Sequence, residues 1–248
     1  MINRIDLQPA YVLHTLPFQN TSLLVDFFCL DYGRVRAVAK GARRPKSRTR
    51  SQLQPFQPLL VTLSGRSEVK TVNAVEFSVP PFSLTGMKLF SALYMNELLV
   101  RLLQFHESHT PLYQNYQRSL VQLHGSEDIA AVLRRFELDL LRELGYQLDL
   151  HHEMDSDRPV IAEALYQFLP ESGFQRLSAV SPDNNGLSTV FHGHDLIALR
   201  ESDFKSRSAA AAAKRLTRIA LKVHLGDKPL LSHQLFRSMQ LSADSDKE

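Results

Sequence analysis

Residues 23–40 read LLVDFFCLDYGRVRAVAK, and this stretch decides the fold of the first third of the chain. An apolar run rich in Val and Phe leads into Asp31-Tyr32-Gly33, where the glycine can adopt a positive φ and reverse the chain. Apolar and basic residues then alternate, so that each kind occupies one face of a strand. The stretch predicts a β-hairpin whose returning strand carries its positive charges on one face, at Arg34, Arg36 and Lys40.

Other strand candidates surround this hairpin. A short apolar run at Tyr11-Val12-Leu13 precedes it, and Leu59–Ser64 and Val69–Phe77 follow it, separated by Gly65. About five strands joined by short turns favour a small closed barrel over a β-sandwich. We therefore predict an OB-fold over residues 1–80, with an SH3-like barrel as the alternative.

Beyond Pro80-Pro81 the period of the apolar residues changes from two to 3.6. Met87–Phe105 is apolar on most sides, as expected of a central bundle helix. A second helix is predicted from Thr110, an N-cap followed by proline, to Gly125. A third, capped by Ser126, should end at Gly145, because its apolar residues follow the amphipathic pattern. Three helices with short connections predict an antiparallel helical bundle over residues 81–150.

The remainder of the chain is less regular. Residues 151–207 mix Gly, Asp, Asn and Pro with short apolar pieces, which predicts an irregular segment with one small hairpin. Helix returns at about Ala209 to Leu225, and residues 208–248 are expected to be C-terminal helices that pack on the bundle. The predicted fold class is α+β, an N-terminal OB-fold β-barrel followed by a helical-bundle domain with an irregular insertion.

Positive charge is concentrated near the N-terminus. Residues 1–80 hold eleven Lys or Arg against five Asp or Glu, while the rest of the chain carries slightly more acid than base. The single cysteine, Cys29, excludes an internal disulfide and suits a reducing compartment. No apolar run approaches the roughly 18 residues of a membrane span, and the first ten residues lack a secretory-signal layout. We expect a cytoplasmic protein.

Most of these charges fall within residues 32–67, which contain nine Lys or Arg and no Asp or Glu. Gly, Pro, Ser and Thr between Lys40 and Ser51 predict a mobile loop that leaves the basic strand. Such a surface can follow a nucleic-acid backbone, because each cation displaces counterions from phosphate. A solubilising loop is the alternative, although exposed faces usually mix both signs. The predicted nucleic-acid contacts are Arg34, Arg36, Lys40, Arg43, Arg44, Lys46, Arg48 and Arg50.

Four aromatic residues near these charges are candidates for stacking on bases: Phe27, Phe28, Tyr32 and Phe56. Core packing is the stronger interpretation for most of them. Because Phe27 and Phe28 are adjacent, only one can face the core of a barrel. Tyr32, at the turn, is the candidate that we retain.

The C-terminal helix predicts a second basic surface. Lys214, Arg218 and Lys222 recur every four residues beside an apolar stripe. This pattern suits an acidic, hydrophobic peptide or a phosphate backbone, and a solvated helix face is the alternative.

No motif predicts catalysis. The chain has no Walker-type glycine loop, no G-x-S-x-G and no H-E-x-x-H. His151, His152, Glu153, Asp155 and Asp157 cluster in the irregular segment and make a metal-dependent nuclease the enzyme alternative. We expect no catalytic site, no metal and no cofactor. An RNA- or ribosome-associated OB-fold protein is the alternative binding function.

Four separated motifs are recognisable in order along the chain. They are VAKGARRPKS at Val38–Ser47 followed by LQPF at Leu53–Phe56; YMNEL at Tyr94–Leu98; LRRFE at Leu133–Glu137 with Leu144-Gly145-Tyr146; and Arg215–Leu221 with Leu225-Gly226 and Lys228–Leu230. Together they resemble the RecO family of DNA repair proteins, from about Tyr11 to Met239.

The resemblance implies an OB-fold, a helical domain and a zinc-bearing or zinc-ribbon-derived segment at residues 151–207. Many family members hold zinc there with four cysteines, and this chain has none in that segment, so we expect no zinc. Also implied are binding of single- and double-stranded DNA and strand annealing in recombinational repair, at the nucleoid. The implied partners are RecR and the acidic C-terminal tail of single-stranded DNA-binding protein. Residues 34–50 would form the DNA surface, and Arg134, with Lys214 and Arg215, would bind the tail.

Overall fold

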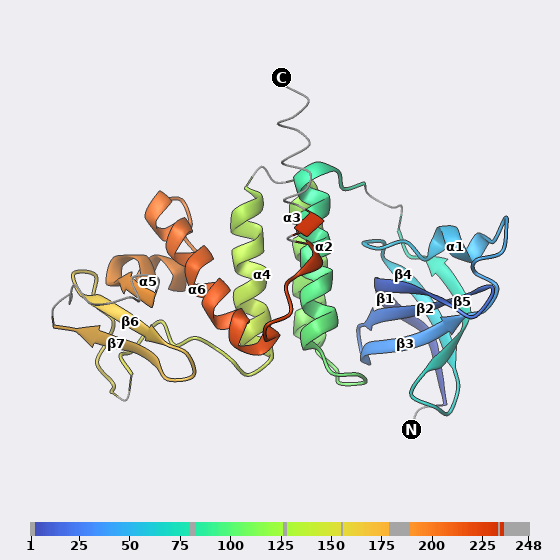
Figure 1. Cartoon of the computed structure of the whole chain (residues 1–248), viewed down its shortest axis with the longest axis horizontal. Helices are drawn as coiled ribbons and strands as arrows, with labels where there is room; N and C mark the ends of the chain where they lie inside the picture. Colours follow the sequence, from blue (N-terminus) through green and yellow to red (C-terminus); the bar gives the residue numbers. More distant parts are fainter. Residues whose placement is uncertain are drawn as a thin grey trace, which may run out of the picture. The chain divides into compact units, whose positions relative to one another are not determined.

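The computed structural model describes residues 3–79, 83–125, 128–154, 156–178, 189–232 and 234–235. The chain divides into two compact units, Met1–Glu127 with Pro229–Glu248, and Asp128–Lys228. Each is described below by itself, with the elements labelled as in Figure 1. No helix among the described residues is long and apolar enough to cross a membrane.

The first unit begins with a closed five-stranded barrel. Its strands are β1 (Arg4–Phe18), β2 (Ser22–Cys29), β3 (Gly33–Ala39), β4 (Leu59–Ser64) and β5 (Lys70–Phe77), and a short helix α1 (Arg48–Gln52) lies between β3 and β4. The strand order is β1-β2-β3-β5-β4, with β1 paired to β4 and β3 parallel to β5. This closed arrangement confirms the predicted OB-fold-like barrel.

Strand β1 is much longer than the apolar run at Tyr11–Leu13 suggests. Its first half pairs with β4 and its second half with β2, and the register shifts once in each pairing. Because a bulge moves the apolar residues from one face to the other, the alternation is interrupted and the sequence pattern marks only the middle of the strand.

The hairpin of β2 and β3 forms as predicted. Gly33 adopts a φ of 59°, and a β-carbon there would lie 1.6 Å from the backbone oxygen of Glu107, so only glycine fits. Val35, Ala37 and Ala39 of β3 are buried in the barrel core, opposite the face that carries the basic residues. The small alanines leave room for larger side chains from β2 and β4.

Two helices of the first unit pack on this barrel, α2 (Gly86–Leu102) and α3 (Thr110–Gly125). Asn96 of α2 donates to the backbone oxygens of Val12 (3.3 Å) and Leu13 (2.9 Å) and accepts from the Tyr116 hydroxyl at 2.6 Å. The Glu97 carboxylate accepts from the backbone N–H groups of Leu231 and Ser232, which holds the later segment of this unit. The barrel and these helices therefore form one compact body.

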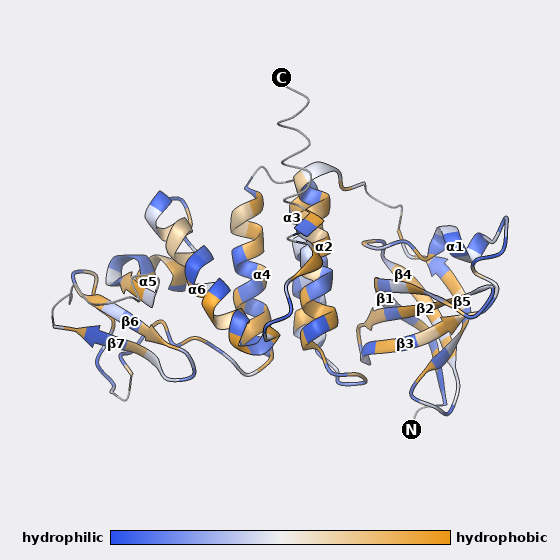
Figure 2. Ribbon diagram, in the orientation of Figure 1, coloured by the Kyte–Doolittle hydropathy of each residue, from blue (hydrophilic) through white to orange (hydrophobic). Residues whose placement is uncertain are grey.

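The second unit contains α4 (Ile129–Glu143), α5 (Gly193–Arg200), α6 (Arg207–Leu225) and a sheet of β6 (Leu165–Leu169), β7 (Gly173–Leu177) and β8 (Val190–His192), in the order β7-β6-β8. Figure 2 shows polar and apolar residues alternating around α4 and α6, as expected of helices that bury one side. Helix α4 is capped by Asp128, whose side chain accepts from the backbone N–H of Ala131 at 2.9 Å. The prediction of Ser126 as the cap, which lies outside the described residues, was wrong because Asp128 makes the capping bond.

Residues 151–207 are more regular than predicted. The expected hairpin is present as β6 and β7, and β8 and α5 add a third strand and a helix. These strands have five, five and three residues, too few for a clear alternation. The predicted boundaries of the four parts of the chain stay predictions. The derivation of residues 151–207 from a zinc ribbon also stays a prediction.

Candidate nucleic-acid interface

The basic segment between β3 and the end of α1 lies on the surface of the barrel. Six of the eight predicted nucleic-acid contacts are exposed: Lys40, Arg43, Arg44, Lys46, Arg48 and Arg50. No acidic residue lies between Tyr32 and Ser67 in the sequence. The segment therefore presents like charges to solvent without local neutralisation, which favours a polyanionic ligand.

The backbone of this segment is held by turns and, at Arg48 and Arg50, by the short helix α1, so it is more regular than the predicted loop. The Arg43 N–H donates to the Thr21 oxygen (2.8 Å), and the Ser47 N–H donates to the Arg44 oxygen (3.1 Å). Ala42 is fully buried, and Gly41 adopts a φ of 70°, a conformation that glycine adopts at little cost. The chain is thus anchored at Ala42 while the basic side chains on both sides point outward.

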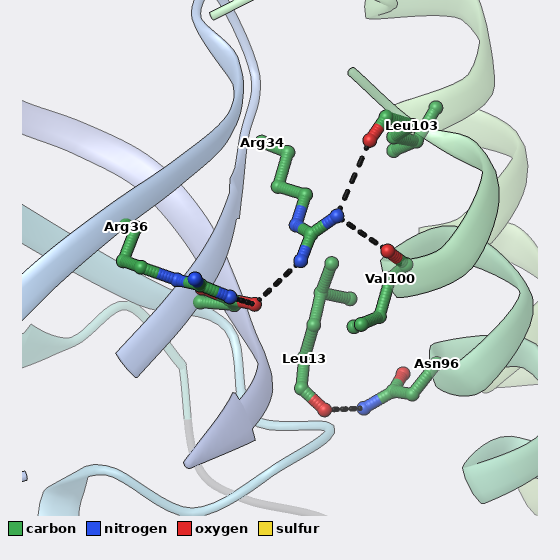
Figure 3. A network of polar contacts seen from close by, with 7 residues as sticks. Leu13, Arg34, Arg36, Asn96, Val100 and Leu103 are labelled. Atoms are coloured by element: carbon green, nitrogen blue, oxygen red, sulfur yellow. Dashed lines mark hydrogen bonds and ion pairs between the residues drawn. The ribbon is translucent and has the colours of Figure 1, made fainter. Parts of the chain in front are cut away.

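The other two predicted contacts, Arg34 and Arg36 (both labelled in Figure 3), donate hydrogen bonds to Asp26 on β2. Arg36 donates to both carboxylate oxygens, at 2.6 and 2.8 Å, and the Arg34 Nη2 donates to Oδ2 at 2.8 Å. The side chains of Asp26, Arg34 and Arg36 are 3, 9 and 32% exposed. Burial alone would raise the pKa of Asp26, but hydrogen bonds from Arg36 and Arg34 outweigh burial, so that this pKa is lowered. The side-chain hydrogen bond between Arg36 and Asp26 also raises the pKa of Arg36.

Arg34 also links the barrel to the end of α2. Its Nη1 donates to the backbone oxygens of Val100 and Leu103, which have no partner within the helix (Figure 3). A cation at this end is also favoured by the helix dipole. Since Arg34 is buried and its charge is used internally, its position supports a role in joining β3 to α2 rather than in contacting DNA.

Core packing, the stronger interpretation for most of the aromatic candidates, is confirmed for three of the four. Phe27 and Phe28 are both fully buried. Phe27 faces the barrel core as expected of one of the pair, whereas Phe28 on the opposite face is covered by Tyr113 and Tyr116 of α3, at ring distances of 5.4 and 6.1 Å. Phe56 is also buried, and Tyr32 is half-buried against the core.

One exposed aromatic ring near the basic strand escaped the sequence analysis. Phe105 is 41% exposed and lies beside β3, where it forms a parallel bridge with Arg34. It is 71 positions away in the sequence, in the connection that follows α2, so that neither spacing nor charge pattern connects it with the hairpin. Only the fold brings the two together.

The predicted peptide-binding residues lie on α4 and α6 of the second unit. Arg134 forms an ion pair with Glu137 (2.7 Å) and donates to the Thr217 hydroxyl at 2.9 Å, with 13% of its side chain exposed. Arg215 donates to the Val190 oxygen at 2.6 Å and lies 4.3 Å above the Phe191 ring. Lys214 is exposed. Arg134 and Arg215 thus meet internal partners, and Lys214 presents its side chain to solvent.

A pocket of about 350 Å³ also lies in this unit, away from those three residues. It is lined by the end of α4, by α6 and by the β6–β7 turn, including Leu141, Tyr146 and His224. The Tyr146 and His224 rings stack at 3.6 Å.

Among the described acidic and histidine residues at 151–157, His152 and Glu153 contact other charged side chains. Among the described residues, no group of three or more His, Cys, Asp or Glu side chains is arranged to hold a metal ion. Glu153 is buried beside Arg158 (3.3 Å) and Arg176 (3.8 Å), and His152 contacts Asp149 at 3.1 Å. Asp155 lies outside the described residues. The buried carboxylate is therefore neutralised by arginines.

Comparison with known proteins finds two family models that match successive parts of the chain. A family model described as "Recombination protein O N terminal" matches residues 4–80, and one described as "Recombination protein O C terminal" matches residues 84–234. The chain belongs to the RecO family. The resemblance seen in the four sequence motifs is thereby confirmed.

Individual relatives extend along nearly the whole chain. The DNA repair protein RecO of Aromatoleum aromaticum is 44% identical over 237 residues, which cover 96% of this chain and 97% of the relative. The protein of the same name from Pectobacterium atrosepticum is 44% identical, covering 97% and 96%, and that of Haemophilus influenzae is 41% identical, covering 93% and 95%. This chain is therefore similar over nearly its whole length to proteins named DNA repair protein RecO.

Proposed function

We propose that this protein binds DNA through its barrel and anneals complementary strands as a non-enzymatic mediator of recombinational repair in the cytoplasm. The observation that carries the proposal is the segment from Lys40 to Arg50, which presents six exposed cations on an OB-fold-like barrel. Barrels of this kind bind single strands by combining a basic surface with stacking side chains.

The mechanism is electrostatic. Cations that contact phosphates release condensed counterions, which favours binding and leaves the bases free to pair. The same positive charge reduces the repulsion between two strands that approach each other. Arg36, which is partly exposed in the middle of β3, extends this surface, whereas Arg34 holds β3 to α2. Double-stranded DNA offers the same phosphates and is expected to bind to the same segment.

We further propose that α4 and α6 bind the acidic C-terminal tail of single-stranded DNA-binding protein, and that RecR is the second partner. Lys214 is exposed and would make the first contact with the tail carboxylates. Arg134 already faces Glu137, so that an incoming carboxylate would compete with an internal one. Arg215 supports the site from the side of β8, through Val190.

The test of the DNA surface is a salt series with a triple variant, Arg43→Ala, Arg44→Ala and Lys46→Ala. Each phosphate contact contributes about 0.7 to the slope of log affinity against log salt for a single strand. We expect the variant to bind a labelled single-stranded oligonucleotide more weakly, with a slope about 2 units shallower than that of the wild type. Fluorescence anisotropy at several salt concentrations measures both quantities.

The matched control removes three exposed cations elsewhere, by Arg118→Ala, Lys205→Ala and Arg207→Ala. It has the same net charge as the loop variant and should keep the wild-type slope. Equal slopes for the two triple variants would contradict the proposal, because net charge alone would then explain the affinity. Tighter binding to RNA than to DNA of the same sequence would favour the RNA-associated alternative, and cleavage of the oligonucleotide with Mg²⁺ or Mn²⁺ would favour the nuclease.

A further inference from the structure

The exposed ring of Phe105 is fixed in place beside the basic strand. Phe105 forms a parallel bridge with Arg34, and the next residue, His106, donates its backbone N–H to the Arg34 oxygen at 2.9 Å. The ring is nevertheless 41% exposed. A single exposed apolar side chain is ordinary on a protein surface, so a binding role for Phe105 depends on the groups around its ring.

Two guanidinium groups lie over this ring. The Cζ atoms of Arg34 and Arg36 are 4.1 and 4.9 Å from the ring centroid. Both groups donate to the same oxygen of Asp26, each at 2.8 Å, which places them together against one part of the ring. The cation–π contacts restrict the side chain of Phe105 in advance, so that a ligand stacking on its exposed part would lose little ordering entropy.

Phe105 also lies in line with the basic segment. Phe105 bridges to Arg34 near the start of β3, Arg36 lies in the middle of the strand, and Lys40 directly follows its end. Arg36 uses Nε and Nη2 for Asp26, which leaves its Nη1 available to a ligand. An aromatic ring, a guanidinium with a spare donor and a row of cations thus follow one another along the barrel, as in surfaces that bind single strands.

We propose that the exposed part of Phe105 stacks on one unpaired base of single-stranded DNA whose phosphates contact Arg36 and the segment Lys40–Arg50. The inference rests on the proposed function and adds a base contact to it. In a duplex the bases are stacked on each other and offer no free face, so that Phe105 contributes to single-strand binding and not to duplex binding. The ring thereby gives the barrel a preference for single-stranded over duplex DNA, which its charges alone cannot provide.

The first test compares Phe105→Ala with Phe77→Ala, a control at an equally exposed phenylalanine (45%) at the far end of β5. Removing a base-stacking aromatic residue weakens binding roughly 5- to 150-fold. We expect a loss in this range for single strands with Phe105→Ala, no change for duplex DNA, and a wild-type salt slope because no charge is removed. Phe77→Ala should bind both as the wild type does.

A second variant keeps an aromatic ring and reports on stacking directly. The chain contains no tryptophan, so Phe105→Trp creates a single indole at the site, which can be excited apart from the tyrosines, and Phe77→Trp creates one elsewhere. We expect single-stranded DNA to quench the indole fluorescence of Phe105→Trp and an abasic oligonucleotide of equal length to bind without quenching it. Neither ligand should affect the fluorescence of Phe77→Trp. This measurement remains decisive if Phe105→Ala fails to fold.

Two contrary results are distinguishable. Wild-type binding of single strands with no quenching of Phe105→Trp would overturn the stacking site and leave the proposed function intact. Failure of the wild type to bind single-stranded DNA would overturn the proposed function itself, and the stacking site with it.

Discussion

At the scale of single residues, Asp26 decides what two of the predicted DNA-binding arginines do. Its buried carboxylate holds both Arg34 and Arg36, and the hydrogen bonds keep its pKa below the ordinary value. An unfolded Asp titrates at about 3.9. The ion pairs therefore stabilise the fold fully above that pH, and this contribution is lost as the pH falls through the lower pKa of the folded state.

We predict that Asp26→Asn destabilises the protein by about 3–5 kcal/mol at pH 7, because it leaves the Arg34 charge buried without its partner. The free energy of unfolding of the variant should also fall less than that of the wild type when the pH is lowered below about 4, because the Asp26 ion pairs are already absent. Urea denaturation at pH 7, 4 and 3 measures both effects. The matched control is Asp6→Asn, which breaks the exposed Arg4–Asp6 pair and should cost less than about 1 kcal/mol. A loss for Asp26→Asn as small as that of the control would contradict the buried network.

The sequence predicts that core and charged residues alternate along β3, but not which of the basic side chains is buried. Val35, Ala37 and Ala39 are identifiable as core residues because they alternate with charged ones. Arg34 and Lys40 look equivalent in that pattern, yet one is buried and the other exposed. The difference depends on Val100 of α2 and on Leu103 directly after the helix, more than 60 residues away, and no local pattern contains it.

At the scale of secondary-structure elements, α4 and α6 are joined by Arg134. The Glu137 side chain is 1% exposed, and Arg134 links it to Thr217 on α6. An effect of an Arg134 variant on partner binding therefore has to be separated from its effect on folding.

We predict that Arg134→Ala destabilises the protein by about 3–5 kcal/mol, since it removes the arginine that pairs with the buried Glu137 carboxylate. Replacing both residues by leucine should recover most of this loss without restoring the binding of a labelled acidic-tail peptide. Lys214→Ala should leave stability within about 0.5 kcal/mol of the wild type and weaken the peptide severalfold. Lys205→Ala, also exposed in this unit, is the control. Full peptide binding by the double leucine variant would exclude Arg134 from the site.

Long helices are predicted from the sequence more accurately than short strands. Helices α3, α4 and α6 span 15 to 19 residues with clear caps or apolar stripes, and their bounds follow from sequence within a few residues. The strand β8 has three residues and pairs with β6 across a long connection, so that no periodic signal marks it.

At the scale of the whole molecule, the proposed DNA surface lies in one unit and the proposed site for the acidic tail lies in the other. The barrel carries the six exposed cations of the segment Lys40–Arg50, whereas Arg134, Lys214 and Arg215 belong to the second unit. Charge distribution in the sequence predicts this division, because the excess of Lys and Arg falls within the first eighty residues. The family motifs, rather than any charge pattern, point to the second site.

The most direct test of the central claim is the annealing of complementary strands, bare and coated with single-stranded DNA-binding protein that has or lacks its acidic tail. We predict annealing of bare strands that weakens as salt rises, and annealing of coated strands only when the tail is present. The loop triple variant should lose annealing in both cases, and Lys214→Ala only on coated DNA. Absence of annealing, or a rate on coated DNA that does not depend on the tail, would contradict the account.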